Sequence, residues 1–298
     1  MKYPKNFGVN IKPRRETDYF LGGSSLDETK INPSGDWSAY LPLKEYQNLG
    51  VETMACVIFS ALNCLEIVLN FKYKESINFS DRFTAKMSNT TKRGNWMTIV
   101  GDSIRNDGLV LESDYPSVWT TWDAYYKPIP QELIHLGTKS KERYKINNEW
   151  IIPTNIEYLV NALKIAPIQI VVHAWDKQVN GIYQRTEKAL NHAVVLINSV
   201  PGQYWEIFDS YDSIVKKLAW DYKIQHGFKY SIIKNKMEFI RIKNYSAVYL
   251  LKGNKAYPIN DSADYLNLEI DWSAVKEVSK EEFSQYEKMI KKLYTFIR

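Results

Sequence analysis

Hydrophobic residues dominate one long stretch in the first quarter of the chain. The run ACVIFSALNCLEIVLNF is almost unbroken in apolar residues, which is the pattern of a helix buried on all sides. We therefore predict a buried helix over 52–70. Apolar residues at helical spacing predict further helices within 80–107 and over 154–166, the latter ending before Pro167.

After Pro167 the pattern changes from helical spacing to short runs rich in β-branched and aromatic residues. Turn residues separate these runs, which is typical of antiparallel strands. The predicted strands lie in IQIVVHAW, GIYQRT, HAVVLINSV, QYWEIFDSY and KMEFIRIK. Helices first and strands afterwards predict the α+β fold class. The stretch 117–150 contains several prolines and shows neither helical nor strand periodicity, so we expect it to wrap between two lobes.

The two ends of the chain differ from its centre. Residues 1–33 are polar and contain prolines and a glycine cluster, so they predict an extended arm. Near the other end, AVYLLKGNKAYPI predicts a hairpin with Gly253-Asn254 at its turn. Further on, Ser279 and Glu282 have the spacing of a helix capping box. We therefore divide the chain into an arm (1–33), a main domain (34–245) and a small C-terminal module (246–298).

The amino-acid composition of the chain limits the classes of function that it can have. The chain has 298 residues and is 45% hydrophobic, enough for a large core. Its net charge of +5 comes from 39 basic and 34 acidic residues spread evenly, so we expect no nucleic-acid partner. Two cysteines argue against a disulfide framework and predict synthesis in a reducing cytoplasm. The N-terminus has no apolar signal-peptide region. We also expect no membrane span, because we find no apolar stretch of about 18 residues in the sequence.

Three residues in separate segments together predict thiol chemistry. Cys56 lies at the predicted start of the buried helix, where the helix dipole stabilises a thiolate. His192 begins one predicted strand, and Asp209 ends the next, where a carboxylate can orient an imidazole. The order and the 136 positions from Cys56 to His192 fit a cysteine nucleophile with a distant histidine.

Other interpretations of these residue types stay open. A lone cysteine is most often an inert core residue, and Cys64, on the same predicted helix, is expected to be one. His173 is the strongest rival to His192, but no carboxylate follows it at a suitable distance. Asp209 could also be a solvated residue at a strand end.

Around these three residues the sequence resembles the papain-like cysteine peptidases over about 34–245. GVETMACVIFSA is similar to the block around the family's nucleophile, although Thr53 and Val57 stand where the family has Cys and Trp. Weaker similarities follow in the family's order. They are Asp36-Trp37, SDRF at 80–83, RGNW at 93–96, DGLVLESDYP at 107–116, NHAV at 191–194 and Asp209-Ser210-Tyr211.

The resemblance implies a two-lobed α+β fold with a helical lobe followed by a barrel-like sheet. It implies peptide-bond hydrolysis through a Cys56–His192–Asp209 triad and an acyl-enzyme, with Asp209 in place of the family's Asn. Gln47 would donate to the oxyanion, although its nine-residue distance from Cys56 requires a short insertion. Peptide or protein substrates would bind at Gly94, Asn95, Trp96, Asn191 and Tyr211. No cofactor or metal is implied.

Two other functions stay open. The chain could be a weakly active or inactive papain-like scaffold that serves assembly, or a Cys-His cell-wall amidase or endopeptidase. The scaffold fits the C-terminal module, because 247–286 resembles an accessory module of bacterial surface and phage proteins. This resemblance implies an assembly partner at 246–298 and would suit a phage particle.

Overall fold

The computed structural model of the chain describes residues 5–18, 31–117, 121–235, 238–252, 255–259 and 275–288. These residues fall into two compact units, 1–233 and 234–298, and each is described by itself below.

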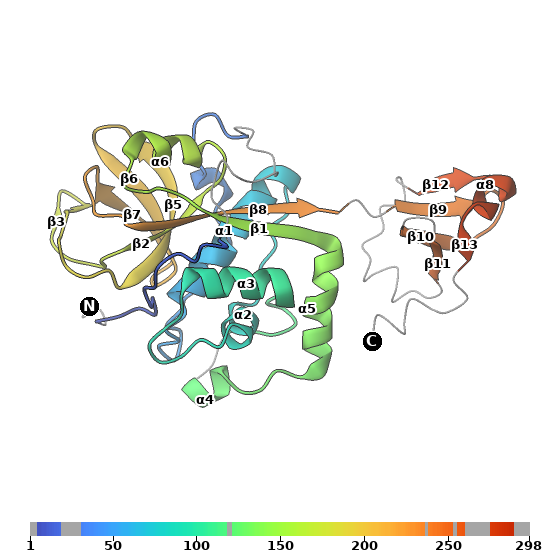
Figure 1. Ribbon diagram of the computed structural model, residues 1–298, viewed down its shortest axis with the longest axis horizontal. Helices are drawn as coiled ribbons and strands as arrows, with labels where there is room; N and C mark the ends of the chain where they lie inside the picture. The colour runs from blue at the N-terminus through green and yellow to red at the C-terminus, as the bar shows by residue number, and fades with distance from the viewer. Residues whose placement is uncertain are drawn as a thin grey trace. The chain divides into compact units, whose positions relative to one another are not determined.

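The first unit begins with helices and continues with strands (Figure 1). Its helical elements are the 3-10 turn η1 (Ser38–Tyr40), α1 (Cys56–Tyr73), α2 (Asp81–Met87), α3 (Met97–Asp107), α4 (Trp122–Tyr125), α5 (Gln131–Arg143) and α6 (Ile156–Leu163). Its strands are β1 (Tyr144–Trp150), β2 (Ile168–Val172), β3 (Gln178–Val179), β4 (Ile182–Tyr183), β5 (His192–Val200), β6 (Tyr204–Asp209), β7 (Ile214–Ala219) and β8 (His226–Lys234). The helices predicted over 52–70, within 80–107 and over 154–166 correspond to α1, to α2 with α3, and to α6.

Helix α1 is the central element of this unit. It packs against α2 and α3 on one side and against β2 and β5 on the other (Figure 1). Every residue from Cys56 to Leu69 is buried, as expected for a helix that is apolar all round. The helix ends where Lys74 adopts the left-handed conformation and its N–H bonds to the carbonyl of Asn70.

The length of α1 requires one correction to the sequence analysis. With 18 residues and a mean hydropathy of 1.4, α1 is long and apolar enough to cross a membrane by length and composition. However, 78% of it is buried inside the protein, which is the burial of a core helix.

The strands form one eight-stranded sheet in the order β1-β8-β2-β5-β6-β7-β4-β3. Strand β5 pairs antiparallel with β2 and β6, and its first six residues are buried without interruption, which explains its unbroken apolar run. Because β5 and β6 are antiparallel, the start of β5 and the end of β6 lie at the same end of the sheet. This topology brings His192 next to Asp209.

Two regions differ from the pattern-based expectation. Within the stretch 117–150, the described residues 121–150 supply α4, α5 and β1. Helix α5 buries only Leu133 and Gly137, so its apolar period is weak. Strands β7 and β8 were not predicted because each buries a lysine, Lys216 and Lys229 respectively, which breaks the apolar alternation.

The second unit is a five-stranded sheet in the order β12-β9-β10-β11-β13. Its elements are β9 (Glu238–Ile242), β10 (Val248–Lys252), β11 (Lys255–Ile259), β12 (Lys276–Val278), α8 (Lys280–Ser284) and β13 (Glu287–Lys288). The predicted hairpin is β10–β11, and its turn at Gly253-Asn254 lies outside the described residues. The predicted capping box of Ser279 and Glu282 is present at α8.

Strand β9 pairs with β10 and β12 and so belongs to the second unit. The division between the units therefore lies between 233 and 234, ahead of the predicted boundary at 245/246. Whether 246–298 acts as a separate functional module stays a prediction.

Four acidic side chains form a cluster at α1 and α2: Glu66 lies on α1, Asp81 is the first residue of α2, and Glu45 and Glu112 come from the segments outside these helices. Burial raises the pKa of all four, and mutual repulsion raises those of Glu66, Asp81 and Glu112 further. The pKa of Glu112 reaches about 7. Arg82 opposes this shift only in part, because its guanidinium donates to the carbonyls of Tyr125 and Ala124.

This acidic cluster predicts that stability falls as the pH rises. A carboxyl with a raised folded-state pKa binds more protons folded than unfolded, so its contribution is present below the unfolded value of about 4.3 and is lost as the pH rises through the folded pKa. Between pH 5 and pH 8 the loss for Glu112 is about 2–3 kcal/mol, because about two pH units separate pH 5 from its folded pKa of about 7 and each unit corresponds to about 1.4 kcal/mol. Burial lowers the pKa of His226. This histidine therefore makes stability rise with pH up to its unfolded pKa of about 6.5, which opposes the effect of the acidic cluster.

The test is urea unfolding of the full chain at pH 5 and pH 8, followed by tryptophan fluorescence. We expect a lower midpoint at pH 8 and a smaller difference between the two pH values in Glu112→Gln. An equal or higher midpoint at pH 8 in the wild-type chain would contradict the prediction.

Candidate active site

Cys56 is the first residue of α1, and its side chain is fully buried. No side chain caps this end of the helix, so its backbone N–H groups leave a positive pole near the sulfur. The backbone N–H of Ala193 donates to the sulfur. Burial nevertheless raises the pKa of the Cys56 thiol, and the charges of Glu52 and Asp209 add to this effect. The thiol is therefore protonated in this state.

His192 stands next to Ala193 at the start of β5 and is also fully buried. Its Nε2 lies 2.7 Å from Oδ1 of Asp209. Its Nδ1 is buried and has no hydrogen-bond partner among the residues that the structure describes. One ring nitrogen is thus held by a carboxylate, and the other is free to exchange a proton. Since the next residue contacts the sulfur of Cys56, the thiol and the imidazole belong to one site.

The rival histidine is engaged elsewhere. Nδ1 of His173 lies 2.7 Å from the carbonyl oxygen of Ala189, and its own carbonyl accepts from the hydroxyl of Tyr222. Cys64 is buried in the same helix as Cys56, and burial raises the pKa of its thiol well above the usual value. Cys64 is thus a core residue, and His173 is a half-buried residue bonded to a backbone carbonyl.

Asp209 ends β6 and accepts hydrogen bonds on both oxygens. Oδ1 accepts from His192 and from the backbone N–H of Tyr211, at 3.0 Å. Oδ2 accepts from Nε1 of Trp175, at 3.0 Å, and from Nζ of Lys216. Burial alone would raise the pKa of Asp209, but His192 and Lys216 outweigh it and hold this pKa far below its usual range. Asp209 is therefore an ionised, immobilised acceptor.

Gln47 lies at this same site although it is nine residues away from Cys56. Its side chain is fully buried, and its Oε1 accepts from the hydroxyl of Ser210, next to Asp209. Its Nε2 donates to the carbonyl oxygen of Phe7 at 3.1 Å. The turn through 48–53 closes because Thr53 donates back to the carbonyl of Gln47. The amide is thus available as a donor to a carbonyl oxygen in the site.

The N-terminal arm lies across these residues. Phe7 is fully buried, and its N–H donates to the carbonyl of Asn191 at 3.0 Å. Its ring centroid is 4.3 Å from that of His192 and 4.7 Å from that of Tyr211. Asn191 also donates through its side chain to the carbonyl of Lys5. The sequence did not reveal this arrangement, because nothing in 1–33 marks which residues the arm contacts.

Beyond Phe7 the arm pairs with the backbone at Gly94 and Asn95. The N–H of Asn95 donates to the carbonyl of Gly8 at 2.8 Å, and the N–H of Asn10 donates to the carbonyl of Asn95 at 2.7 Å. Gly8 and Gly94 must both lack a side chain, because the backbone of another segment approaches each of them closely. A Cβ on Gly94 would lie 1.8 Å from the carbonyl oxygen of Gly8. A Cβ on Gly8, where φ is +117°, would lie 2.0 Å from the carbonyl oxygen of Met54.

The remaining predicted substrate residue, Trp96, has its side chain elsewhere. Its ring packs against those of Trp150 and His226, at centroid distances of 5.7 and 5.2 Å. The arm contacts the other predicted substrate residues: the backbone of Gly94 and Asn95, the backbone and side chain of Asn191, and the ring of Tyr211.

Two residues around Asp209, Trp175 and Lys216, were not predicted from the sequence, because no motif contains them.

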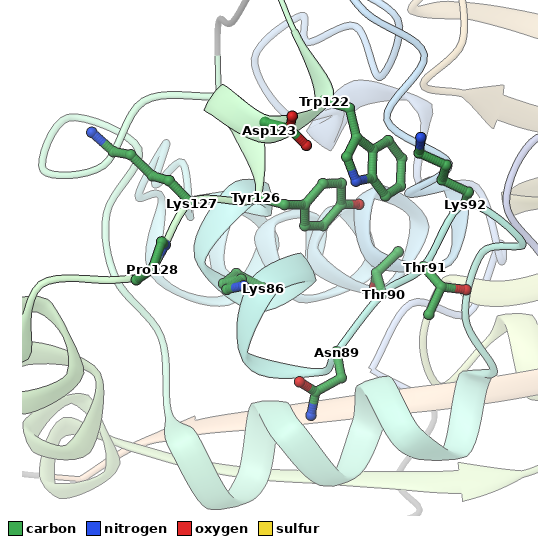
Figure 2. A pocket seen from close by; sticks show the side chains of 10 residues that line it. All are labelled: Lys86, Asn89, Thr90, Thr91, Lys92, Trp122, Asp123, Tyr126, Lys127 and Pro128. Atoms are coloured by element: carbon green, nitrogen blue, oxygen red, sulfur yellow. The ribbon is translucent and has the colours of Figure 1, made fainter.

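A cavity of about 650 Å³ adjoins the turn from Thr91 to Gly94 (Figure 2). Its lining residues are Lys86, Asn89, Thr90, Thr91, Lys92, Trp122, Asp123, Tyr126, Lys127 and Pro128. The hydroxyl of Tyr126 donates to the carbonyl of Thr53, three residues before Cys56. One lining residue thus contacts the segment leading into α1, and lysines outnumber acids in the lining of the cavity.

Comparison with known proteins finds distant relatives. No family model matches the chain. Cathepsin L 2 of Paramecium tetraurelia is 27% identical over 165 residues, which cover 53% of this chain and 49% of that protein. Cathepsin L 1 of the same organism is 26% identical over the same shares. The chain thus spans about half the length of the curated relatives it matches.

Solved structures show the same fold. Digestive procathepsin L 3 from the larval midgut of Tenebrio molitor has a TM-score of 0.50 and 18% identity, covering 67% of this chain and 70% of that one. Procathepsin L2 from the same source has a TM-score of 0.52 and 11% identity, covering 76% and 78%. These similarities confirm the α+β papain-like fold predicted from the sequence.

The fit of Gly8 predicts that a single added methyl group displaces the arm. Gly8→Ala combines a clash with the Met54 carbonyl with a positive φ, which together cost more than about 1.4 kcal/mol, or a factor of ten in population. We expect iodoacetamide to alkylate Cys56 at least about tenfold faster in Gly8→Ala than in the wild-type chain. Peptide mass spectrometry after timed quenching measures the rate at each cysteine.

Gly202→Ala is the matched control, because φ there is +73° and an added Cβ meets nothing within 4 Å. Alkylation of Cys64 reports global unfolding and should stay slow. Unchanged labelling of Cys56 in Gly8→Ala would show that the arm does not guard the thiol.

Proposed function

We propose that this chain, a distant homologue of the papain-like (C1) cysteine peptidases, hydrolyses peptide bonds through Cys56, His192 and Asp209. The observation that carries the proposal is the state of His192. One nitrogen of its ring is bonded to a buried carboxylate, and the other has no hydrogen-bond partner within the described part of the chain. The next residue contacts the sulfur of Cys56. A base held in one orientation beside a thiol at a helix start is the arrangement for nucleophilic catalysis.

In the proposed reaction, Nδ1 of His192 takes the thiol proton as the sulfur of Cys56 attacks the substrate carbonyl carbon. The carbonyl oxygen becomes an oxyanion, to which Gln47 Nε2 and the backbone N–H of Cys56 donate. His192 then passes its proton to the leaving amine, and a thioester remains on Cys56. Water, deprotonated by His192, attacks the thioester and releases the acid and the thiol. Asp209 holds the ring throughout.

The substrate class follows from the arm. Residues 5–10 are a polypeptide segment whose backbone pairs with Asn95 and Asn191 and whose carbonyl at Phe7 accepts from Gln47. These same groups would pair with the backbone of a protein or peptide substrate. The arm and a substrate would therefore compete, and the full chain would be inhibited until the arm leaves.

The two other functions predicted from the sequence are decided by the same experiments. A scaffold would label at Cys56 once the arm is displaced and yet cleave no peptide. A cell-wall amidase would release stem peptides from peptidoglycan and leave other peptides intact. The comparisons give no support to the phage association, which stays a prediction together with the cytoplasmic origin and a partner for 246–298.

Turnover of a fluorogenic peptide library by Gly8→Ala tests the proposal. In that background we expect Cys56→Ala to abolish turnover and His192→Ala to lower kcat/KM by about 10²–10⁴-fold. Cys64→Ala is the matched control and should retain activity. An epoxide thiol inhibitor should modify Cys56.

Cleavage that persists in Cys56→Ala would contradict the proposal, as would modification at Cys64 in place of Cys56. Circular dichroism of each variant separates loss of chemistry from loss of fold.

A further inference from the structure

Asp209 poses a charge problem within the proposed active site. The carboxylate is fully buried, where an unpaired charge is costly. A carboxylate bonded to an imidazole also stabilises the protonated ring, which retards transfer of that proton to a leaving amine. A neutral acceptor would hold the ring without this effect.

Lys216 supplies the missing positive charge from the neighbouring strand. Its side chain is 4% exposed, and its Nζ bonds to Oδ2 of Asp209 and to Oδ1 of Asp212. It lies 5.0 Å from the centroid of the Trp175 ring. Lysine is almost never fully buried without a partner, so this placement depends on the carboxylates.

Strand geometry explains why Lys216, and not the adjacent Lys217, reaches Asp209. Lys216 pairs with Ile207 across β6–β7, and Ile207 and Asp209 share one face because they are two residues apart. The next residue, Lys217, points to the other face. It is 42% exposed and lies 3.9 Å from Glu206. The two adjacent lysines thus have opposite environments.

We propose that Lys216 is a positioning residue that neutralises Asp209, so that the Asp209–Lys216 pair presents His192 with an acceptor of zero net charge. The ammonium occupies Oδ2 and thereby keeps Oδ1 directed at the ring. This inference rests on the proposed function for its catalytic meaning, but the electrostatic effect on His192 can be measured without activity.

The titratable and charged groups around His192 come from several elements. They are Glu52 before α1, Cys56 on α1, Asp209 on β6, Tyr211 and Asp212 in the following turn, and Lys216 on β7. Asp212 retains contact with Lys216 when Asp209 is changed, so the lysine keeps a partner in that variant.

A double-mutant cycle read out by NMR tests the proposal in the full chain. The measurement is the pH midpoint of the ¹⁵N-labelled His192 ring, assigned with His192→Gln. Lys216→Met leaves the carboxylate unbalanced and should move the midpoint up by about one to two pH units. Asp209→Asn removes the negative charge bonded to the ring, while Lys216 stays in place against Asp212, and should move the midpoint down. Asp209→Asn with Lys216→Met should return it to within about half a unit of wild type.

Lys217→Met is the matched control and should leave the midpoint unchanged. Shifts of the same sign in both single variants would overturn the proposal, as would a double variant that does not return or an equal shift in Lys217→Met. If Lys216→Met does not fold, the comparison of Asp209→Asn with the double variant still decides, because the proposal requires the double variant to titrate higher.

The same cycle separates this inference from the proposed function. If the midpoints follow the predicted signs but no variant cleaves peptides in the Gly8→Ala background, charge balance stands and the peptidase proposal fails. If peptides are cleaved but the midpoints do not follow these signs, the peptidase proposal stands and the role of Lys216 fails.

Discussion

Burial of α1 between the helices and the sheet is the constraint on which the site depends. The helix is apolar on every side, so it is stable only when both α2–α3 and β2–β5 cover it. That packing places the first residue of the helix, Cys56, beside the start of β5, where Ala193 donates to its sulfur. The antiparallel return of β6 then brings Asp209 to His192. A change that loosened α1 would separate the thiol from the imidazole before it affected either group.

Charges buried around this core have partners on neighbouring strands of the sheet, or else stay protonated. Lys216 is paired with Asp209, and Lys229 on β8 with Glu149 on β1. The acidic cluster at Glu45, Glu66, Asp81 and Glu112 lacks such balance, and its carboxyls have raised pKa values instead. Paired charges maintain the interior at neutral pH, whereas the unpaired cluster favours acidic conditions. The protein therefore combines an ionised site with a helical region that is more stable when protonated.

The arm uses the site's own hydrogen-bonding groups. Gln47, Asn95 and Asn191 each bond to a backbone group of residues 5–10, and the ring of Phe7 covers His192. Those groups are the ones a substrate would need. The same arrangement of donors and acceptors therefore holds the arm over the thiol and would bind a polypeptide substrate. The absence of a side chain at Gly8 and Gly94 allows the arm to pass this close.

The sequence by itself determined the elements whose signals are local. Short windows of sequence contain the apolar run of α1, the β-branched run of β5 and the capping box at Ser279, so helices followed by strands could be predicted as an α+β fold. The order of Cys56, His192 and Asp209 could also be read from the sequence, although these residues lie far apart along the chain. Tertiary structure decided what depends on contacts between distant residues. No short sequence pattern predicts that Phe7 covers His192 or that the Trp96 ring packs into the core. The same holds for the burial of Lys216 and Lys229 in strands β7 and β8. The sequence pattern predicts that a lysine in a strand is exposed to solvent. Its burial becomes favourable only because another strand places a carboxylate beside its ammonium group.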